Sequence, residues 1–213
     1  MQNPWRKLRK EGPYILEEDM DAVLRYNQKA KDNYKLMDEL MPVPFVGNVL
    51  DSEIIILMLN PRYRSENKIK ENENYKEKLI KVFNHEPVEY PFFFLDPNVV
   101  IGKKYWSSKL KGLKKIYKSE EQVSKNVSTI QLQPYHSTQF KLLKDIPSQK
   151  YNAYLVRKAI ERKAFIIIAR GKKHWLQLVP ELESYNYFTL NSWRSPSISE
   201  KNCPKLFEVL KAQ

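Results

Sequence analysis

The feature that most constrains the fold of this chain is an uninterrupted apolar run that stops abruptly at a polar corner. Residues 53–59 read Glu-Ile-Ile-Ile-Leu-Met-Leu, and the chain continues with Asn60 and Pro61. Such a run is typical of a buried strand that delivers polar groups to one edge of a sheet. In open α/β sheets ligands bind at the carboxyl ends of the strands. Asn60 and Pro61 are therefore the first candidates for a functional site.

A second polar corner follows a later apolar run. Residues 187–190 predict another strand, and the chain then turns through Asn191 to Ser197. If both strands belong to one parallel sheet, their carboxyl ends meet at the same edge. We therefore expect Asn60 and Ser195 to face each other across a single cleft, so that one ligand touches both.

The alternation of predicted strands and helices defines the fold class. The predicted strands are 53–59, 127–132, 165–169 and 187–190, and helices are predicted over 16–40, 75–83, 103–118, 147–163 and 172–179, with a final helix that residues 199–202 cap and that runs to about 210. Strands separated by helices form crossovers and hence a mostly parallel sheet covered on both faces. We expect an α/β protein with four strands in the sheet. The whole chain, 1–213, is predicted to be one domain, with 1–43 as an N-terminal helical extension packed on it.

The charge of the chain favours an anionic partner. There are 37 Lys and Arg against 25 Asp and Glu, a formal net charge of +12. Such an excess favours nucleic acid, and DNA most of all, although a lysine-rich chain can simply be well solvated. The helix predicted over 103–118 places lysines on the face opposite its apolar stripe, which could grip phosphates or serve only as a solvated surface.

Several classes of site and location are not expected. The one cysteine, Cys203, excludes a disulfide within the chain and a cysteine-rich zinc site, and the three histidines are scattered, so neither a metal nor another cofactor is predicted. No apolar run approaches membrane-spanning length, and the N-terminus lacks the apolar core of a signal peptide. The simplest expectation is a cytoplasmic protein without a membrane partner or an evident obligate protein partner.

The order of these motifs resembles the uracil-DNA glycosylase superfamily from about Pro44 to Lys211. The segment 58–63 matches the family's first motif at Asn60-Pro61, with Met58 in place of a glycine, and the late motif matches at Ser195-Pro196. Between them, the strand over 165–169 followed by Arg170-Gly171 looks like the family's strand and Trp-Gly-like turn. The resemblance implies a three-layer α/β/α sandwich and hydrolysis of the bond between a flipped base and its sugar.

The resemblance also implies roles for particular residues. Asn60 would orient water, and His136 or Arg194 would stabilise the departing base. The residues expected to bind substrate are Pro61, Tyr63, Gln131, Gln133, Trp193, Ser195, Pro196 and Ser197, with either glutamine as the base-edge contact. Arg62, Arg170 and Lys172 are expected to contact the nucleic-acid backbone.

Each of these roles has a structural alternative. Asn60 could simply form an Asx turn, and a lone histidine such as His136 is more often a structural hydrogen-bonder than a catalyst. Arg194 could be a surface ion-pair partner, and serines near a helix start are ordinary caps. The main hypothesis is therefore a nucleobase glycosylase acting on DNA. The alternatives are a catalytically weakened nucleic-acid-binding module of the same fold, or a hydrolase of a small nucleotide-like substrate.

Overall fold

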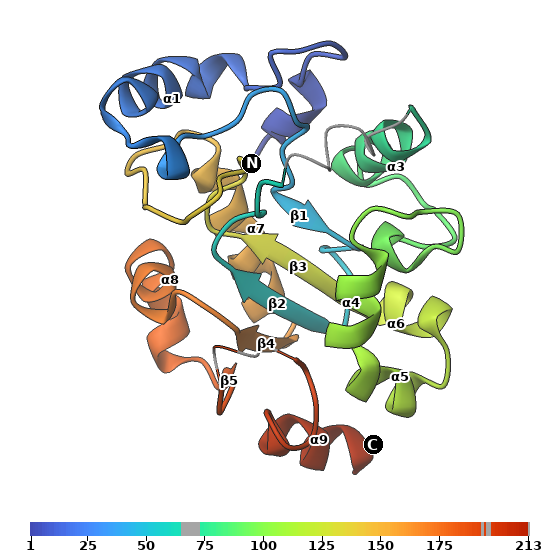
Figure 1. Cartoon of the computed structure of the whole chain (residues 1–213). Helices are drawn as coiled ribbons and strands as arrows, with labels where there is room; N and C mark the ends of the chain where they lie inside the picture. Colours follow the sequence, from blue (N-terminus) through green and yellow to red (C-terminus); the bar gives the residue numbers. More distant parts are fainter. Residues whose placement is uncertain (65–72, 193, 195–196, 213) are drawn as a thin grey trace.

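A five-stranded, mostly parallel sheet forms the centre of the protein (Figure 1). The computed structural model describes residues 1–64, 73–192, 194 and 197–212. The strands are β1 (Phe45–Val46), β2 (Ile54–Met58), β3 (Val127–Gln131), β4 (Phe165–Ile168) and β5 (Phe188–Thr189). Their order across the sheet is β1-β3-β2-β4-β5, and β1 alone is antiparallel to its neighbour. The expected α/β class is confirmed.

All four strands expected from the sequence are present, but the sheet has a fifth. Strand β1 has only two residues and pairs with β3 through Phe45 and Ile130. Gly47 makes this pairing possible, because a Cβ there would lie 2.2 Å from the Ser128 side chain and the residue has a φ of +99°. Only glycine adopts this backbone conformation without strain in so close an approach. The expected four strands were therefore one too few.

Strand β2 is the central strand, and its sequence reflects this position. It pairs in parallel with β3 on one side and β4 on the other. All five of its residues are buried. A strand covered on both faces needs apolar side chains at every position, which explains the continuous run of isoleucine, leucine and methionine.

Helices surround the sheet. The α-helices are α1 (Glu17–Lys29), α3 (Glu73–Phe83), α4 (Lys103–Lys109), α5 (Lys111–Tyr117), α6 (Glu120–Asn126), α7 (Gln149–Glu161), α8 (Lys172–Leu178) and α9 (Pro204–Lys211), and the short 3-10 helices are η1 (Pro4–Lys7), η2 (Asp32–Tyr34), η3 (Phe93–Leu95) and η4 (Pro180–Ser184). Helix α7 contacts both β3 and β4 and lies behind the sheet in Figure 1. The chain passes from α6 directly into β3, and α8 follows β4 after a tight turn.

Two predicted helices are shorter than their sequence patterns. The helix expected over 16–40 ends at Lys29, because the chain becomes extended at Ala30, and only the short η2 follows. The helix expected over 103–118 is divided at Leu110 into α4 and α5. The apolar side chains of this segment still point inward, so the pattern identified the buried face but not the break.

The N-terminal segment is packed on the rest of the protein. Trp5 is buried against Phe83 and Tyr135. The Tyr135 hydroxyl donates a 2.6 Å hydrogen bond to Asp19, whose other carboxylate oxygen accepts from the backbone of Ser148. These contacts join α1, the segment after β3 and the start of α7.

Candidate functional site

The strand order locates the place where a ligand is expected to bind. From β2 the chain crosses to β3 on one side, and it then returns past β2 to β4 on the other side. Ligands of open α/β sheets bind outside the carboxyl ends of the strands at such a reversal. The turn after β2 carries Asn60, and the turn after β4 carries Arg170. The two turns are adjacent, because the N–H of Ala169 donates to the carbonyl of Leu57 and a Cβ on Gly171 would lie 2.4 Å from Leu59.

The side chain of Asn60 is held through its nitrogen, whereas its oxygen accepts no hydrogen bond from the described residues. Its Nδ2 donates to the Ser137 hydroxyl at 2.8 Å and to the Pro61 carbonyl at 3.1 Å. Ser137 in turn donates to the Gln139 carbonyl at 2.8 Å. Among the described residues none donates to the Asn60 Oδ1, and the residue is only half-buried. That oxygen is therefore available to accept a hydrogen bond from water or from a ligand.

His136 has the surroundings of a structural residue. It is buried, its Nε2 lies 3.1 Å from the carbonyl of Met41, and its Nδ1 lies 3.4 Å from the carbonyl of Arg62. Burial lowers the pKa of His136 to about 4, against smaller opposing effects of these two carbonyls, so the ring is neutral at pH 7. A neutral imidazole has one N–H, and the shorter contact assigns it to Nε2. These contacts favour the structural alternative for His136 over proton transfer to a departing base.

The two candidate glutamines have different positions. Gln131 is the last residue of β3, and its backbone carbonyl accepts from Asn152 on α7. Gln133 lies beyond the strand, where its N–H donates to the carbonyl of Leu59 beside the Asn60 turn. The Gln133 Oε1 accepts from Leu143, and its Nε2 is buried with no hydrogen-bond partner among the described residues. Gln133 is therefore the better placed of the two to contact a ligand near Asn60.

The other residues predicted around the Asn60 turn differ in their burial and in their contacts. Pro61 is buried, and Arg62 is exposed beside Ser137. The Tyr63 hydroxyl donates to Glu39 at 2.8 Å, which turns this ring toward the N-terminal segment. Lys172, the first residue of α8, is exposed and stands over the ring of Tyr187.

Asn202 links the two ends of the second polar corner, which spans residues 191–197. Trp193, Ser195 and Pro196 lie outside the described residues, so their expected place opposite Asn60 stays a prediction. The side chain of Asn202 accepts from the Ser192 N–H at 2.6 Å and donates to the Ser197 carbonyl at 2.9 Å. Asn202 therefore holds both ends of the loop that contains Arg194, which is itself exposed.

This loop is also attached to α4. The N–H of Ile198 donates to the carbonyl of Lys109 at 2.8 Å. A Cβ on Gly112 would lie 2.4 Å from the Ile198 carbonyl, so the loop and the start of α5 are in close backbone contact. Strand β5 is parallel to β4, and its carboxyl end is at the same edge of the sheet as the ends of β2 and β4.

A cluster of cations around one tyrosine lies near these turns, and the sequence analysis did not find it. Lys109 is buried, and its Nζ lies 4.5 Å from the ring centroid of Tyr105, which is half exposed. Burial, and then the charge of Arg170, lower the pKa of Lys109 to about 7. Partial burial raises the pKa of Tyr105, and Arg170 and Arg64 oppose this effect. We call Arg64, Tyr105, Lys109 and Arg170 the basic cluster.

A sequence signal for part of this cluster exists. Tyr105 and Lys109 are four residues apart in a helical pattern, so they share a face. The pattern does not distinguish Lys109 from the exposed lysines of the same segment, because burial depends on contacts between distant segments, which a local pattern does not contain.

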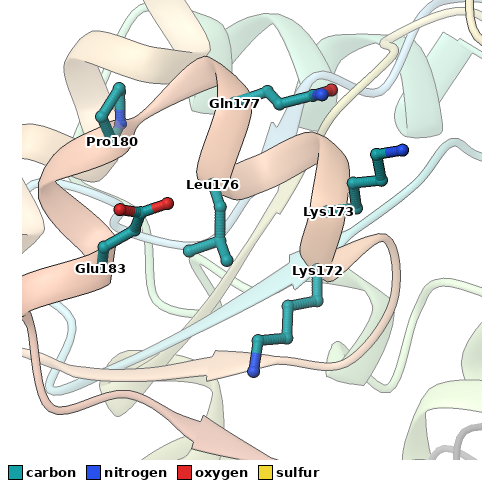
Figure 2. Close-up of a pocket in the computed structure, with 6 residues that line it drawn as sticks. All are labelled: Lys172, Lys173, Leu176, Gln177, Pro180 and Glu183. Atoms are coloured by element: carbon teal, nitrogen blue, oxygen red, sulfur yellow. The ribbon is translucent and has the colours of Figure 1, made fainter.

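An open surface depression lies elsewhere, between α8 and η4 (Figure 2). Its lining residues are Lys172, Lys173, Leu176, Gln177, Pro180 and Glu183. Lys173 points away from Glu183 in Figure 2. The opposite face of α8 carries Trp175, which is buried and donates to the carbonyl of Met58 at 3.0 Å. The depression therefore lies on the outer face of α8, and among the predicted site residues that the structure describes only Lys172 lines it.

Searches of the described parts of the chain for other kinds of site gave no candidate. In residues 1–64, 73–192, 194 and 197–212, no three His, Cys, Asp or Glu side chains are grouped in a way that could hold a metal ion. No helix within these ranges is both long and apolar enough to cross a membrane. Comparisons with protein-family models, with curated proteins and with solved structures found no match.

Proposed function

We propose that this chain is a DNA-binding protein with a uracil-DNA glycosylase-like fold that hydrolyses the N-glycosidic bond of a flipped base. The observation that carries the proposal is the position of Asn60. It follows the central strand at the reversal of strand order, and its Oδ1 is open to a ligand or water. An enzyme that acts on a base needs that base out of the stack, and the flipped base would be held at the Asn60 turn.

The reaction assigns different tasks to Asn60 and Arg170. Breaking the glycosidic bond develops positive charge on the sugar and negative charge on the departing base. The Asn60 Oδ1 would orient the attacking water, although an amide does not ionise and cannot be a strong base. Arg170 in the neighbouring turn carries a permanent positive charge that would stabilise the anionic base.

The finer description of the fold belongs to the same proposal. Asn60-Pro61 follows β2, Arg170-Gly171 follows β4, and the loop containing Arg194 follows β5. The order of these turns along the sheet supports the proposal of a uracil-DNA glycosylase-like fold. A three-layer sandwich with helices on both faces of the sheet is the corresponding architecture.

A catalytically weakened DNA-binding module is the second candidate function. It is favoured by His136, whose two ring nitrogens both face backbone carbonyls, and by the Nδ2 of Asn60, which is already bonded to Ser137. Such a protein would bind damaged DNA without forming abasic sites.

The experiment is a screen of oligonucleotides that carry uracil, hypoxanthine, xanthine or a mismatch, scored for abasic-site formation. Asn60→Ala should abolish base release while leaving the thermal unfolding of the protein nearly unchanged. Asn186→Ala is the matched control, because Asn186 is exposed and precedes β5 at the opposite edge of the sheet. Base release by Asn60→Ala at the wild-type rate would contradict the proposed role. Tight binding to DNA without any base release would favour the second candidate.

A further inference from the structure

Helix α5 carries its lysines on one face. The segment 103–118, which forms α4 and α5, contains seven lysines and no acidic residue. At 3.6 residues per turn, Lys111, Lys114, Lys115 and the C-cap residue Lys118 lie within an arc of about 100° around the axis of α5. All four side chains are exposed. We call these four residues the α5 lysine face.

The opposite side of α5 is packed against the protein. Leu113 is fully buried, and Ile116 and Tyr117 pack against the core. A helix that binds a membrane surface must insert apolar side chains into the lipid, and those of α5 are already used for packing inside the protein. The α5 lysine face therefore offers positive charge without exposed apolar side chains, which suits a row of phosphates rather than a bilayer.

The α5 lysine face also differs from the other helices in its ion pairing. Lysines of α3, α6 and α7 each pair with a glutamate three or four residues away on the same helix: Lys76 with Glu73, Lys125 with Glu121, and Lys158 with Glu161. On α5, Lys114 lies 3.7 Å from Glu120, the first residue of α6. Among the described residues no carboxylate forms a salt bridge with Lys111, Lys115 or Lys118. Like charges at this spacing repel and destabilise a helix, and a bound polyanion would offset that repulsion.

Helix α5 is attached to the segment that follows the second polar corner. The N–H of Ile198 donates to the carbonyl of Lys109 at 2.8 Å, immediately before α5 begins. A Cβ on Gly112 would lie 2.4 Å from the Ile198 carbonyl and 2.8 Å from the Cα of Ser199. The loop before Ile198 follows the carboxyl end of β5, at the same edge of the sheet as the Asn60 turn. The α5 lysine face is therefore held in a fixed position relative to that loop.

We propose that the α5 lysine face binds the phosphate backbone of one strand of double-stranded DNA. This inference rests on the proposed function, since it locates the DNA partner on the surface of the protein. From Lys111 to Lys118 the helix rises by about 10 Å, at about 1.5 Å per residue. One strand of a duplex carries a phosphate about every 3.4 Å along its axis, so the face spans about three phosphates. Lys111, Lys115 and Lys118 supply one cation for each of them.

The test measures the affinity for a short undamaged duplex at salt concentrations between about 50 and 200 mM. For the wild type, the logarithm of the association constant should fall linearly with the logarithm of the salt concentration. Replacing Lys111, Lys115 and Lys118 together by glutamine should reduce the magnitude of this slope by about 2.7, at about 0.9 for each lost phosphate contact. Glutamine has nearly the helix propensity of lysine, so thermal unfolding of this α5 variant should match that of the wild type.

The matched control replaces Lys10, Lys29 and Lys31 by glutamine. These exposed lysines belong to the N-terminal segment around α1, and α1 lies at the opposite end of the molecule from α5 in Figure 1. The control removes the same net charge as the α5 variant, so it separates a local phosphate contact from the effect of total charge. Its slope should stay close to that of the wild type.

Several outcomes decide the inference separately from the proposed function. An unchanged slope in the α5 variant, or an equal reduction in the α5 variant and the control, would overturn the α5 surface and leave DNA binding and base release elsewhere intact. If the α5 variant lost binding to vesicles of anionic lipid while its duplex binding was unchanged, the face would belong to a membrane and the inference would be wrong. A reduced slope in the α5 variant alone, without base release from any lesion by the wild type, would retain the surface and remove the glycosylase activity.

Discussion

Replacing Lys109 by methionine should change how the stability of the protein depends on pH. Lys109 is 5% exposed, and its pKa is lowered to about 7 by burial and by Arg170. An unfolded lysine has a pKa near 10.4, so between these values the unfolded chain binds more protons than the folded chain. The free energy of unfolding of the wild type therefore gains up to about 1.4 kcal/mol per pH unit from this one group as pH rises.

The difference between wild type and variant isolates this contribution. From pH 8 to 9.5 the wild type should gain about 2 kcal/mol relative to Lys109→Met, since the other titrating groups are common to both proteins. Near pH 7 the variant should be the more stable of the two, because methionine fills the same buried space without a charge. Its lost contact with the Tyr105 ring offsets this gain by only about 1 kcal/mol.

The assay is urea unfolding followed by circular dichroism at several pH values, with Lys104→Met as the control. The exposed Lys104 should give a curve parallel to that of the wild type. If the curves of wild type and Lys109→Met also run parallel from pH 8 to 9.5, Lys109 is charged in the folded protein and the electrostatic account of the basic cluster is wrong.

Four further outcomes follow from the structure. DNA affinity should fall steeply with added salt because of the +12 net charge, and binding that does not depend on salt would remove the nucleic-acid partner. Burial lowers the pKa of His136, so between pH 6.5 and 4 the unfolded chain binds more protons than the folded chain. The free energy of unfolding of the wild type should therefore fall by up to about 1.4 kcal/mol for each pH unit of acidification. His136→Gln should remove this contribution, as urea unfolding at several pH values can measure. Gly112→Ala should destabilise by about 1–3 kcal/mol, because its Cβ would meet the Ile198 carbonyl at 2.4 Å, and an unchanged melting temperature would contradict that contact. Trp175→Phe should cost about 0.5–1.5 kcal/mol, because the buried Met58 carbonyl loses one of its two donors and keeps the N–H of Leu132, and this loss should appear in the urea midpoint.

Strand signals proved more informative than helix lengths in this chain. The runs at Ile54–Met58 and Phe165–Ile168 are continuous because both strands are buried, and this burial makes them visible in the sequence. Helix ends are set by contacts that the pattern does not contain. The break at Leu110 accompanies the approach of the Ile198 backbone to Gly112, a contact between segments almost ninety residues apart in sequence.

The candidate site could likewise be predicted only in part from the sequence. Asn60 and Arg170 could be placed at the carboxyl edge from the sequence, because each directly follows an apolar strand. The side-chain environment of His136 could not be predicted, since its partners Met41 and Arg62 come from other segments of the chain. The same holds for Asn202, which lies between two serines only in the folded protein.

The sequence by itself determined the α/β class, four of the five strands and the polar turns at their ends, because these depend on local patterns of apolar and turn-forming residues. Only the tertiary structure decided the order of the strands, the fifth strand and the burial of Lys109 beside Arg170. The physical reason is that local patterns record whether a residue is covered, whereas the identity of its neighbours depends on how distant segments pack. The free energy of a charge depends on those neighbours, so the basic cluster became visible only in three dimensions.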